Sequence, residues 1–158
     1  MSMTPDEFRA ALGRFATGVT ILTARDAQGG DHGMTVSAFA SVSLAPPLVL
    51  ACIAKDADMH AVLRGTASFA LSVLAADQEP LSRRFAEEPD NRFDGIRFTR
   101  SQAGVVLFGG AHAQLECRSV AWHDAGDHSI CVGEVTRAVL GGGEPLLYYR
   151  GAYTKLST

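Results

Sequence analysis

Residues 33–47 read GMTVSAFASVSLAPP, and this stretch predicts both a strand and a ligand site. Hydroxyl side chains alternate with small apolar residues, so an extended strand would place the hydroxyls on one face and the methyls on the other. That face carries no charged side chain and suits a flat or phosphorylated ligand lying close to backbone N–H groups. An ordinary strand with its hydroxyls facing water is the alternative. The hydroxyl residues are Thr35, Ser37, Ser41 and Ser43.

Segments typical of strands dominate on both sides of this stretch. Thr4, Pro5 and Glu7 predict a helix that ends at Gly18. Two further short helices are expected, one after Asp56 or Asp58 and one after Asp77, and the charged run 87–92 is expected to be a surface loop. Strands with two or three peripheral helices predict a mainly β protein, an antiparallel barrel in one domain of residues 1–158. The predicted strands cover residues 19–24, 48–54, 68–74, 111–123, 129–140 and 146–149.

Composition and charge exclude several classes of protein. With 158 residues, 47% of them hydrophobic and 20% charged, the chain has the length and composition of one globular domain. The formal net charge of -3 provides no electrostatic footprint for nucleic acid. No apolar run approaches the roughly 20 residues that cross a bilayer, and the first residues lack a basic region followed by an apolar one. We therefore expect a cytoplasmic protein with no nucleic-acid or membrane partner.

Cysteine and histidine form no metal motif in this sequence. Each of the three cysteines lies in an apolar run, so buried structural thiols in a reducing compartment are favoured, and a reactive cysteine is the alternative. The five histidines form no i, i+4 pair, so no bound metal is expected. Glycine-rich dinucleotide and P-loop motifs are absent, so a nucleotide must bind in another way. The cysteines are Cys52, Cys117 and Cys131.

The tripeptide Gly126-Asp127-His128 lies where two long predicted strands meet in a hairpin. Gly126 can adopt positive φ, and Asp127 can fix the turn or orient the neighbouring imidazole. His128 would then stand at the rim of the barrel, well placed to meet a ligand. The alternative is that Asp127 and His128 only stabilise the turn and contact no ligand.

Four segments, in their order along the chain, resemble the short flavin reductases with the FMN-binding split-barrel fold. That family includes the reductase components of two-component flavin-dependent monooxygenases. The resemblance runs from about residue 8 to residue 153 and implies an antiparallel split β-barrel with peripheral helices. The segments are FATGVT at 15–20, GMTVSAFASVS at 33–43 with PPLVL at 46–50, LSRRFA at 81–86, and GDH at 126–128 with GEV at 133–135.

This resemblance implies flavin contacts in two strands and one helix. Phe85 is implied to pack near the flavin, and Arg84 to lie near the flavin tail or a neighbouring subunit, together with Arg92 and Phe93. Without the resemblance, Lys55 is a solvated strand end and Arg83-Arg84 form a solvated helix face. The contacts implied along the isoalloxazine ring and ribityl chain are Thr35, Val36, Ser37, Ala38 and Ser41. Those implied near the ring edge or phosphate are Ile53, Ala54 and Lys55.

For the nicotinamide of NADH or NADPH, the resemblance implies a place beside His128, with Gly126 and Asp127 shaping the turn. His128 is the implied catalytic residue, and its role is to position the ring, since hydride transfer is chemistry that the cofactors supply. Tyr153, on the last matching strand, is either a nicotinamide contact or a core or dimer contact.

Two functions of different class follow. The resemblance implies a homodimeric NAD(P)H:flavin oxidoreductase that reduces FMN or FAD and supplies the reduced flavin, by diffusion, to a separate monooxygenase component. The alternative is a non-catalytic flavoprotein that holds flavin as an electron carrier or redox sensor. The sequence leaves open the choice between FMN and FAD, the choice between NADH and NADPH, whether flavin is a tight cofactor or a released substrate, and which monooxygenase is served.

Overall fold

Seven strands form one antiparallel sheet in the computed structural model, which describes residues 1–87 and 90–157. The sheet order is β3-β2-β6-β9-β10-β5-β4, with β3 and β4 at the two edges. Both long predicted hairpin strands are present, and they pair along most of their length. The strands are β2 (Thr20–Arg25), β3 (Asp31–Val36), β4 (Phe39–Leu44), β5 (Pro47–Ala54), β6 (Ser68–Val73), β9 (Ala113–Ala125) and β10 (His128–Leu140).

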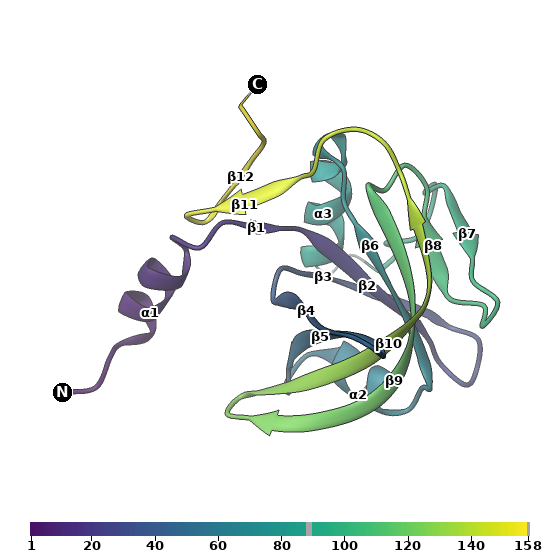
Figure 1. Cartoon of the computed structure of the whole chain (residues 1–158), viewed down its shortest axis with the longest axis horizontal. Helices are drawn as coiled ribbons and strands as arrows, with labels where there is room; N and C mark the ends of the chain where they lie inside the picture. The colour runs from purple at the N-terminus through teal and green to yellow at the C-terminus, as the bar shows by residue number, and fades with distance from the viewer. Residues whose placement is uncertain (88–89, 158) are drawn as a thin grey trace.

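The connection between the two edge strands makes this sheet a barrel. β3 ends at Val36 and β4 begins at Phe39, so only Ser37 and Ala38 lie between them. Three Cα–Cα steps span at most about 11 Å, and the two edges must therefore lie close together. Within the described residues, no ladder joins β3 to β4. The sheet curls almost closed and stays open between its edges, as Figure 1 shows, which confirms the predicted antiparallel split barrel.

The prediction of one hydroxyl face from Thr35 to Ser43 is wrong. Thr35 belongs to β3, whereas Ser41 and Ser43 belong to β4 and pair with β5 at the other edge. A register shift between Ser41 and Ser43 breaks the alternation again. A two-residue period in the sequence describes side-chain direction only within one strand, and it cannot reveal that the chain changes strands at Ser37.

Short strands and three helices surround the barrel. The helices are α1 (Pro5–Leu12), α2 (Asp58–Arg64) and α3 (Glu79–Ala86), and the 3-10 turn η1 (Ala76–Gln78) precedes α3. A small sheet contains β1 (Thr17–Gly18), β11 (Leu147–Tyr149) and β12 (Ala152–Thr154), and a second contains β7 (Phe98–Arg100) and β8 (Val106–Phe108). In the described part of the chain, no helix is both long and apolar enough to cross a membrane.

Two helix boundaries differ from the predicted ones. The capping box of α1 is present, since Thr4 Oγ1 accepts from Glu7 N at 3.2 Å and Thr4 N donates to Glu7 Oε2 at 2.8 Å. However, α1 ends at Leu12 with Gly13 as its cap, well before Gly18, which lies in a strand. Helix α2 is capped by neither predicted aspartate, because its N-cap is residue 57. Of the predicted loop 87–92, residues 88 and 89 lie outside the described residues.

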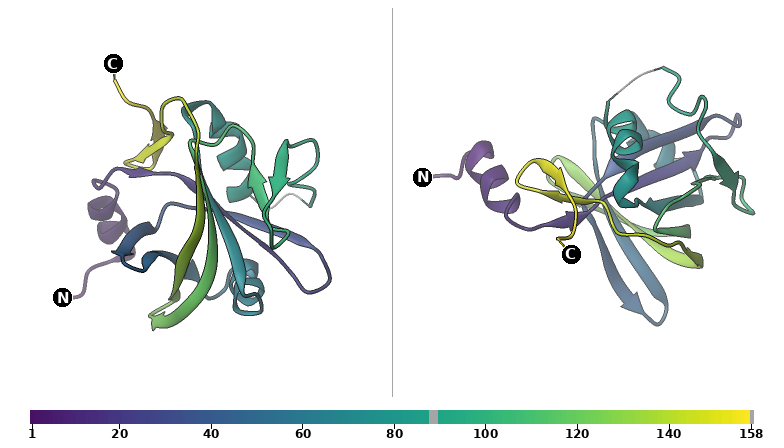
Figure 2. Two further views of the ribbon diagram at one scale, coloured as in Figure 1. Left: turned by 45° about the vertical axis from the view of Figure 1, so that its right-hand side comes forward. Right: turned by 90° about the horizontal axis from the view of Figure 1, so that it is seen from above.

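The apolar side chains form two main cores on opposite faces of β2. Leu22 points into the barrel with Phe69 and other buried side chains. Ile21 points outward and packs with Phe85 of α3 and Phe108 of β8. β2 is therefore buried on both faces, which explains its continuous apolar sequence. Because α3 covers the outer face, it lies beside β3 and the C-terminal strands, where the site is built (Figure 2).

Candidate functional site

The turn between β9 and β10 gathers several of the predicted residues. Gly126 has a φ of 67°, which only glycine adopts without strain, so the tight turn depends on it. His128, the first residue of β10, pairs with Ala54 of β5. The carbonyl of Asp127 accepts from the backbone N–H of Lys55 at 2.9 Å. Residues from the end of β5 and from the hairpin turn therefore meet at one end of the barrel.

At this turn, His128 presents an oriented and accessible imidazole. Its Nδ1 lies 2.6 Å from Asp127 Oδ1, and 46% of its side chain is exposed. This hydrogen bond lowers the pKa of the Asp127 carboxyl, so Asp127 remains ionised at neutral pH. Since a carboxylate only accepts, the proton sits on Nδ1 and Nε2 faces outward as an acceptor, or as a second donor when the ring is protonated. Lys55 Nζ, 3.5 Å from Asp124 Oδ1, adds a positive charge nearby.

A cleft of about 530 Å³ opens between the end of β3, helix α3 and the C-terminal strands; we call it the C-terminal cleft. Thr35 and Ser37, predicted flavin contacts, line it together with Tyr153, a predicted nicotinamide contact. Thr35 Oγ1 donates to the carbonyl of Ser82 at 2.6 Å, and Ser82 Oγ lies 2.7 Å from Tyr153 Oη. The structure therefore brings residues predicted to contact the flavin close to a residue predicted to contact the nicotinamide, with α3 between them.

Sequence reasoning missed three α3 residues at this cleft. Glu79 and Arg83 line it. Ser82 forms hydrogen bonds with two residues that line it, Thr35 and Tyr153. Their spacing of three and four residues places them on one helical face, which could have been read from the sequence. The sequence alone favours a solvated helix face for Arg83-Arg84. The last strand predicted from the sequence ends at residue 149, before β12, the three-residue strand whose Tyr153 lies against Ser82.

A second cleft, also of about 530 Å³, lies on the other side of Thr35; we call it the β3 cleft. Its aromatic wall contains Phe85 and Phe93, whose ring centroids lie 5.0 Å apart. Phe85 is 2% exposed and belongs to the outer core, so it supports this wall from within. Gly33 is needed beside it, because a Cβ there would lie 2.8 Å from Phe85 Cε1.

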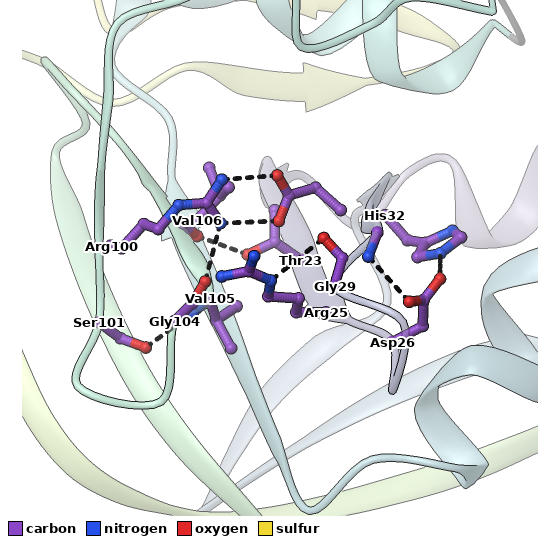
Figure 3. Close-up of polar contacts among 12 residues, drawn as sticks. Thr23, Arg25, Asp26, Gly29, His32, Arg100, Ser101, Gly104, Val105 and Val106 are labelled. Atoms are coloured by element: carbon purple, nitrogen blue, oxygen red, sulfur yellow. Dashed lines mark hydrogen bonds and ion pairs between the residues drawn. The ribbon is translucent and has the colours of Figure 1, made fainter.

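Polar contacts fix the β2–β3 hairpin that forms the rim of the β3 cleft, as Figure 3 shows. His32 Nε2 lies 2.7 Å from Asp26 Oδ2, and this contact lowers the pKa of the Asp26 carboxyl. Arg100 of β7 donates twice to Asp31, at 2.8 Å each, and this pair lowers the pKa of the Asp31 carboxyl. Thr23 Oγ1 also donates to the carbonyl of residue 106 at 2.7 Å. The hairpin is thereby held against β7 and β8.

The other predicted flavin residues occupy different environments. Val36 and Ile53 have buried side chains, 4% and 0% exposed, so only their main chain can face a ligand. Ala38 and Ser41 are exposed, on the link between the edge strands and on β4. Arg84 Nη2 donates to two loop carbonyls, of residues 91 and 94, so its guanidinium holds the loop after α3. Their contacts with flavin remain predictions.

The buried cysteines are structural, as predicted from their apolar surroundings. Burial raises the pKa of Cys117 to about 12 and that of Cys131 to about 11. Both are therefore neutral thiols near pH 7 and weak nucleophiles. Cys52 is only half-buried, and all three cysteines are free.

The predicted nicotinamide residues lie in two places on one chain. His128 stands at the β9–β10 turn, whereas Tyr153 lies in the C-terminal cleft, and His128 is absent from the described residues that line either cleft.

Hydroxyls, aromatic walls and one oriented imidazole suit the binding of a flat, polar ring better than acid–base catalysis by a buried carboxylate.

Comparisons with known proteins identify relatives over almost the whole chain. The family model of the flavin reductase like domain matches residues 12–157. The FMN reductase (NADH) SmoA of Agrobacterium fabrum is 47% identical over 95% of this chain and 85% of its own length. HsaB of Rhodococcus jostii, the reductase subunit of a flavin-dependent monooxygenase, is 38% identical over 97% of this chain and 78% of its own. The NADH:FAD oxidoreductase SgcE6 of Streptomyces globisporus, solved with NAD and FAD fragments, superposes with a TM-score of 0.92 at 38% identity, covering 99% of this chain and 97% of that one.

Proposed function

This chain belongs to the family of flavin reductase like domains, and on that basis we infer that it is an enzyme that transfers a hydride from NADH to FMN or FAD. The observation that carries the inference is the 47% identity, over 95% of the chain, to an FMN reductase that uses NADH. The alternative of a non-catalytic electron carrier receives no support from the relatives. The choice of NADH over NADPH follows from the same relatives.

The residues present fit a flavin. The C-terminal cleft of about 530 Å³ lies within the roughly 300–1,000 Å³ typical of cofactor sites. Its wall offers hydroxyls from Thr35 and Ser37, and the small, exposed residue Ala38 follows directly along the chain. We assign flavin contacts to these three residues and to Ser41. We also assign them to the main chain of Val36 and Ile53, whose side chains are buried. Lys55 supplies a positive charge for a phosphate.

Flavin supplies the hydride acceptor when it is bound, and the protein contributes alignment and exclusion of water. In the proposed complex, His128 faces the nicotinamide, where Nε2 can bond to the carboxamide. Asp127 holds the ring in one orientation through Nδ1 at 2.6 Å. Tyr153 forms part of the nicotinamide side of the C-terminal cleft, and Phe85 supports the wall of the neighbouring β3 cleft from the core.

The proposed activity is tested by adding NADH to the purified protein in air, with FMN or FAD as the acceptor, and following the loss of NADH absorbance. We expect consumption that depends on free flavin and is faster with NADH than with NADPH. A protein that consumes neither nicotinamide with either flavin would contradict the proposal. Tightly bound flavin without turnover would favour the electron carrier.

We propose that the reduced flavin leaves the enzyme and is used by a separate monooxygenase component. Relatives such as HsaB are reductase components of monooxygenase systems, which supports this arrangement. The three free thiols fit a reducing compartment, so we place the enzyme in the cytoplasm.

A homodimer is the proposed assembly, supported by the apolar surface of one chain. Helix α1 has no buried residue and stands away from the barrel in Figure 1 and in the right-hand view of Figure 2. Phe8 and Phe15, in and just after this helix, are 56% and 75% exposed. At the open edge of the sheet, Val42 and Leu44 of β4 are 49% and 96% exposed. Such apolar groups on an edge strand and an unpacked helix indicate an interface. The same edge carries Ser41, so a second copy would also cover the flavin side.

Replacing both Phe15 and Leu44 by glutamate should convert the dimer to a monomer. Two charges in an apolar interface cannot be solvated, so we expect dissociation at micromolar concentration, measured as mass by light scattering. Ala27→Glu, at the exposed β2–β3 turn, is the control and should leave the dimer intact. A monomeric wild-type protein, or a double variant that remains dimeric, would contradict this interface.

A further inference from the structure

One buried serine connects two walls of the C-terminal cleft. Ser82 in α3 is 0% exposed, and its hydroxyl lies 2.7 Å from Tyr153 Oη on β12. Its backbone carbonyl accepts the hydroxyl of Thr35 on β3 at 2.6 Å. The last residues of β3 and the C-terminal strands are far apart in sequence, and these two hydrogen bonds join them through a single helical position.

The tyrosine ring that Ser82 holds is fixed on other sides as well. The guanidinium carbon of Arg83 lies 4.8 Å from the centroid of the Tyr153 ring, in cation–π geometry. Arg83 is itself held by Glu79, which accepts from Nε at 3.0 Å and from Nη2 at 2.8 Å. The Tyr148 ring packs against it, with the two ring centroids 5.2 Å apart and an interplanar angle of 69°. One orientation of the phenol is therefore strongly favoured.

Helix stability does not explain the serine. Serine is less favourable than alanine inside a helix, because its hydroxyl competes for backbone hydrogen bonds. The two buried residues of α3 are Ser82 and Phe85, and only the serine is polar. Burying a hydroxyl costs little free energy when it has a hydrogen-bond partner. Here the partner is Tyr153, which lines the C-terminal cleft.

We propose that Ser82 is a positioning residue for hydride transfer. This inference rests on the proposed function, in which Thr35 contacts the flavin and Tyr153 the nicotinamide. By bonding to both, Ser82 fixes the flavin side and the nicotinamide side of the cleft relative to each other. Hydride transfer needs donor and acceptor atoms at close distance and in line, so a loosened wall slows the transfer more than it weakens binding.

The hydrogen bond itself is tested without NADH or flavin. Ser82→Ala, Tyr153→Phe and the double variant are unfolded in urea together with wild type. Because the two single changes remove the same bond, the double variant should lose less stability than the sum of the single losses. Alanine is a good helix former, so Ser82→Ala is expected to fold, and Tyr153→Phe tests the same bond from the other side.

The role in the reaction is tested by rapid kinetics on the same variants. At saturating NADH, the rate constant for flavin reduction in Ser82→Ala should fall by about two- to tenfold, the range expected for one lost hydrogen bond, while flavin affinity stays within about twofold. Tyr153→Phe should show the same fall, and the double variant should be no slower. Ser72→Ala is the matched control, because Ser72 is also 0% exposed and accepts from Phe108 N at 3.2 Å, away from the cleft.

Three results would overturn the inference. They are a Ser82→Ala variant that reduces flavin at the wild-type rate, rate losses that add in the double variant, and an equal loss of rate in Ser72→Ala. Each of these leaves the proposed function intact, because the wild-type enzyme is active in all of them. A wild-type chain that reduces neither flavin would instead contradict the proposed function, and this inference with it.

Discussion

The His128→Ala variant should reduce flavin about ten- to a hundredfold more slowly than wild type, while its affinity for FMN or FAD is unchanged. The imidazole is held by Asp127 at 2.6 Å, is 46% exposed and presents Nε2 at the end of the barrel. In the proposed complex, this nitrogen contacts the nicotinamide and not the flavin. Its removal therefore weakens alignment of the hydride donor only.

Stopped-flow reduction at saturating NADH measures this effect, and flavin fluorescence measures the affinity. His123→Ala is the matched control, since His123 is an exposed histidine of the same hairpin, on β9. Asp127→Ala should have a smaller effect, because it removes the orientation of the ring but not the ring. Equal rates in His128→Ala and wild type would remove His128 from the mechanism, and a large loss of flavin affinity would assign it to the flavin instead.

The position of His128 could be predicted because the signal is local. A glycine followed by Asp-His between two long apolar strands predicts a tight hairpin turn, and the structure has that turn with Gly126 at a φ of 67°. The pairing of His128 with Ala54 follows once β10 lies beside β5. Turn chemistry and strand length together therefore predicted one half of the candidate site.

The other half depends on contacts that no short segment encodes. The hydroxyl-rich stretch was interpreted as one strand, because its alternation continues across Ser37 and Ala38, where the chain passes from one edge of the sheet to the other. Ser82 faces β12, which is three residues long and lies about seventy residues further along the chain. Leu81 precedes it and Arg83 follows it, so nothing in the local sequence points to the contact with Tyr153. That contact depends on packing between segments that are distant in the sequence.

A large effect on stability is expected for Gly133→Ala, in the middle of β10. A Cβ at Gly133 would lie 2.4 Å from Phe69 Cζ and 2.9 Å from Phe69 Cε1. Phe69 is 3% exposed and packed within the barrel core, so its ring cannot move aside without displacing other side chains. The third atom near this Cβ is Cys117 Cβ, at 3.3 Å, so the new methyl group cannot shift toward Cys117 to avoid the Phe69 ring. Overpacking of this kind lowers the free energy of unfolding by about 1–3 kcal/mol.

Urea unfolding at one fixed protein concentration measures this loss, since the stability of the proposed dimer would depend on concentration. Gly142→Ala is the control: a Cβ there meets no described atom within 4 Å, so its effect should stay within about 0.5 kcal/mol. Adding Phe69→Leu to Gly133→Ala should recover part of the loss, because the shorter side chain vacates the space that the new methyl needs. If Gly133→Ala is as stable as wild type, the Phe69 ring moves freely, and the packing of the Phe69 side chain against Gly133 does not explain this glycine.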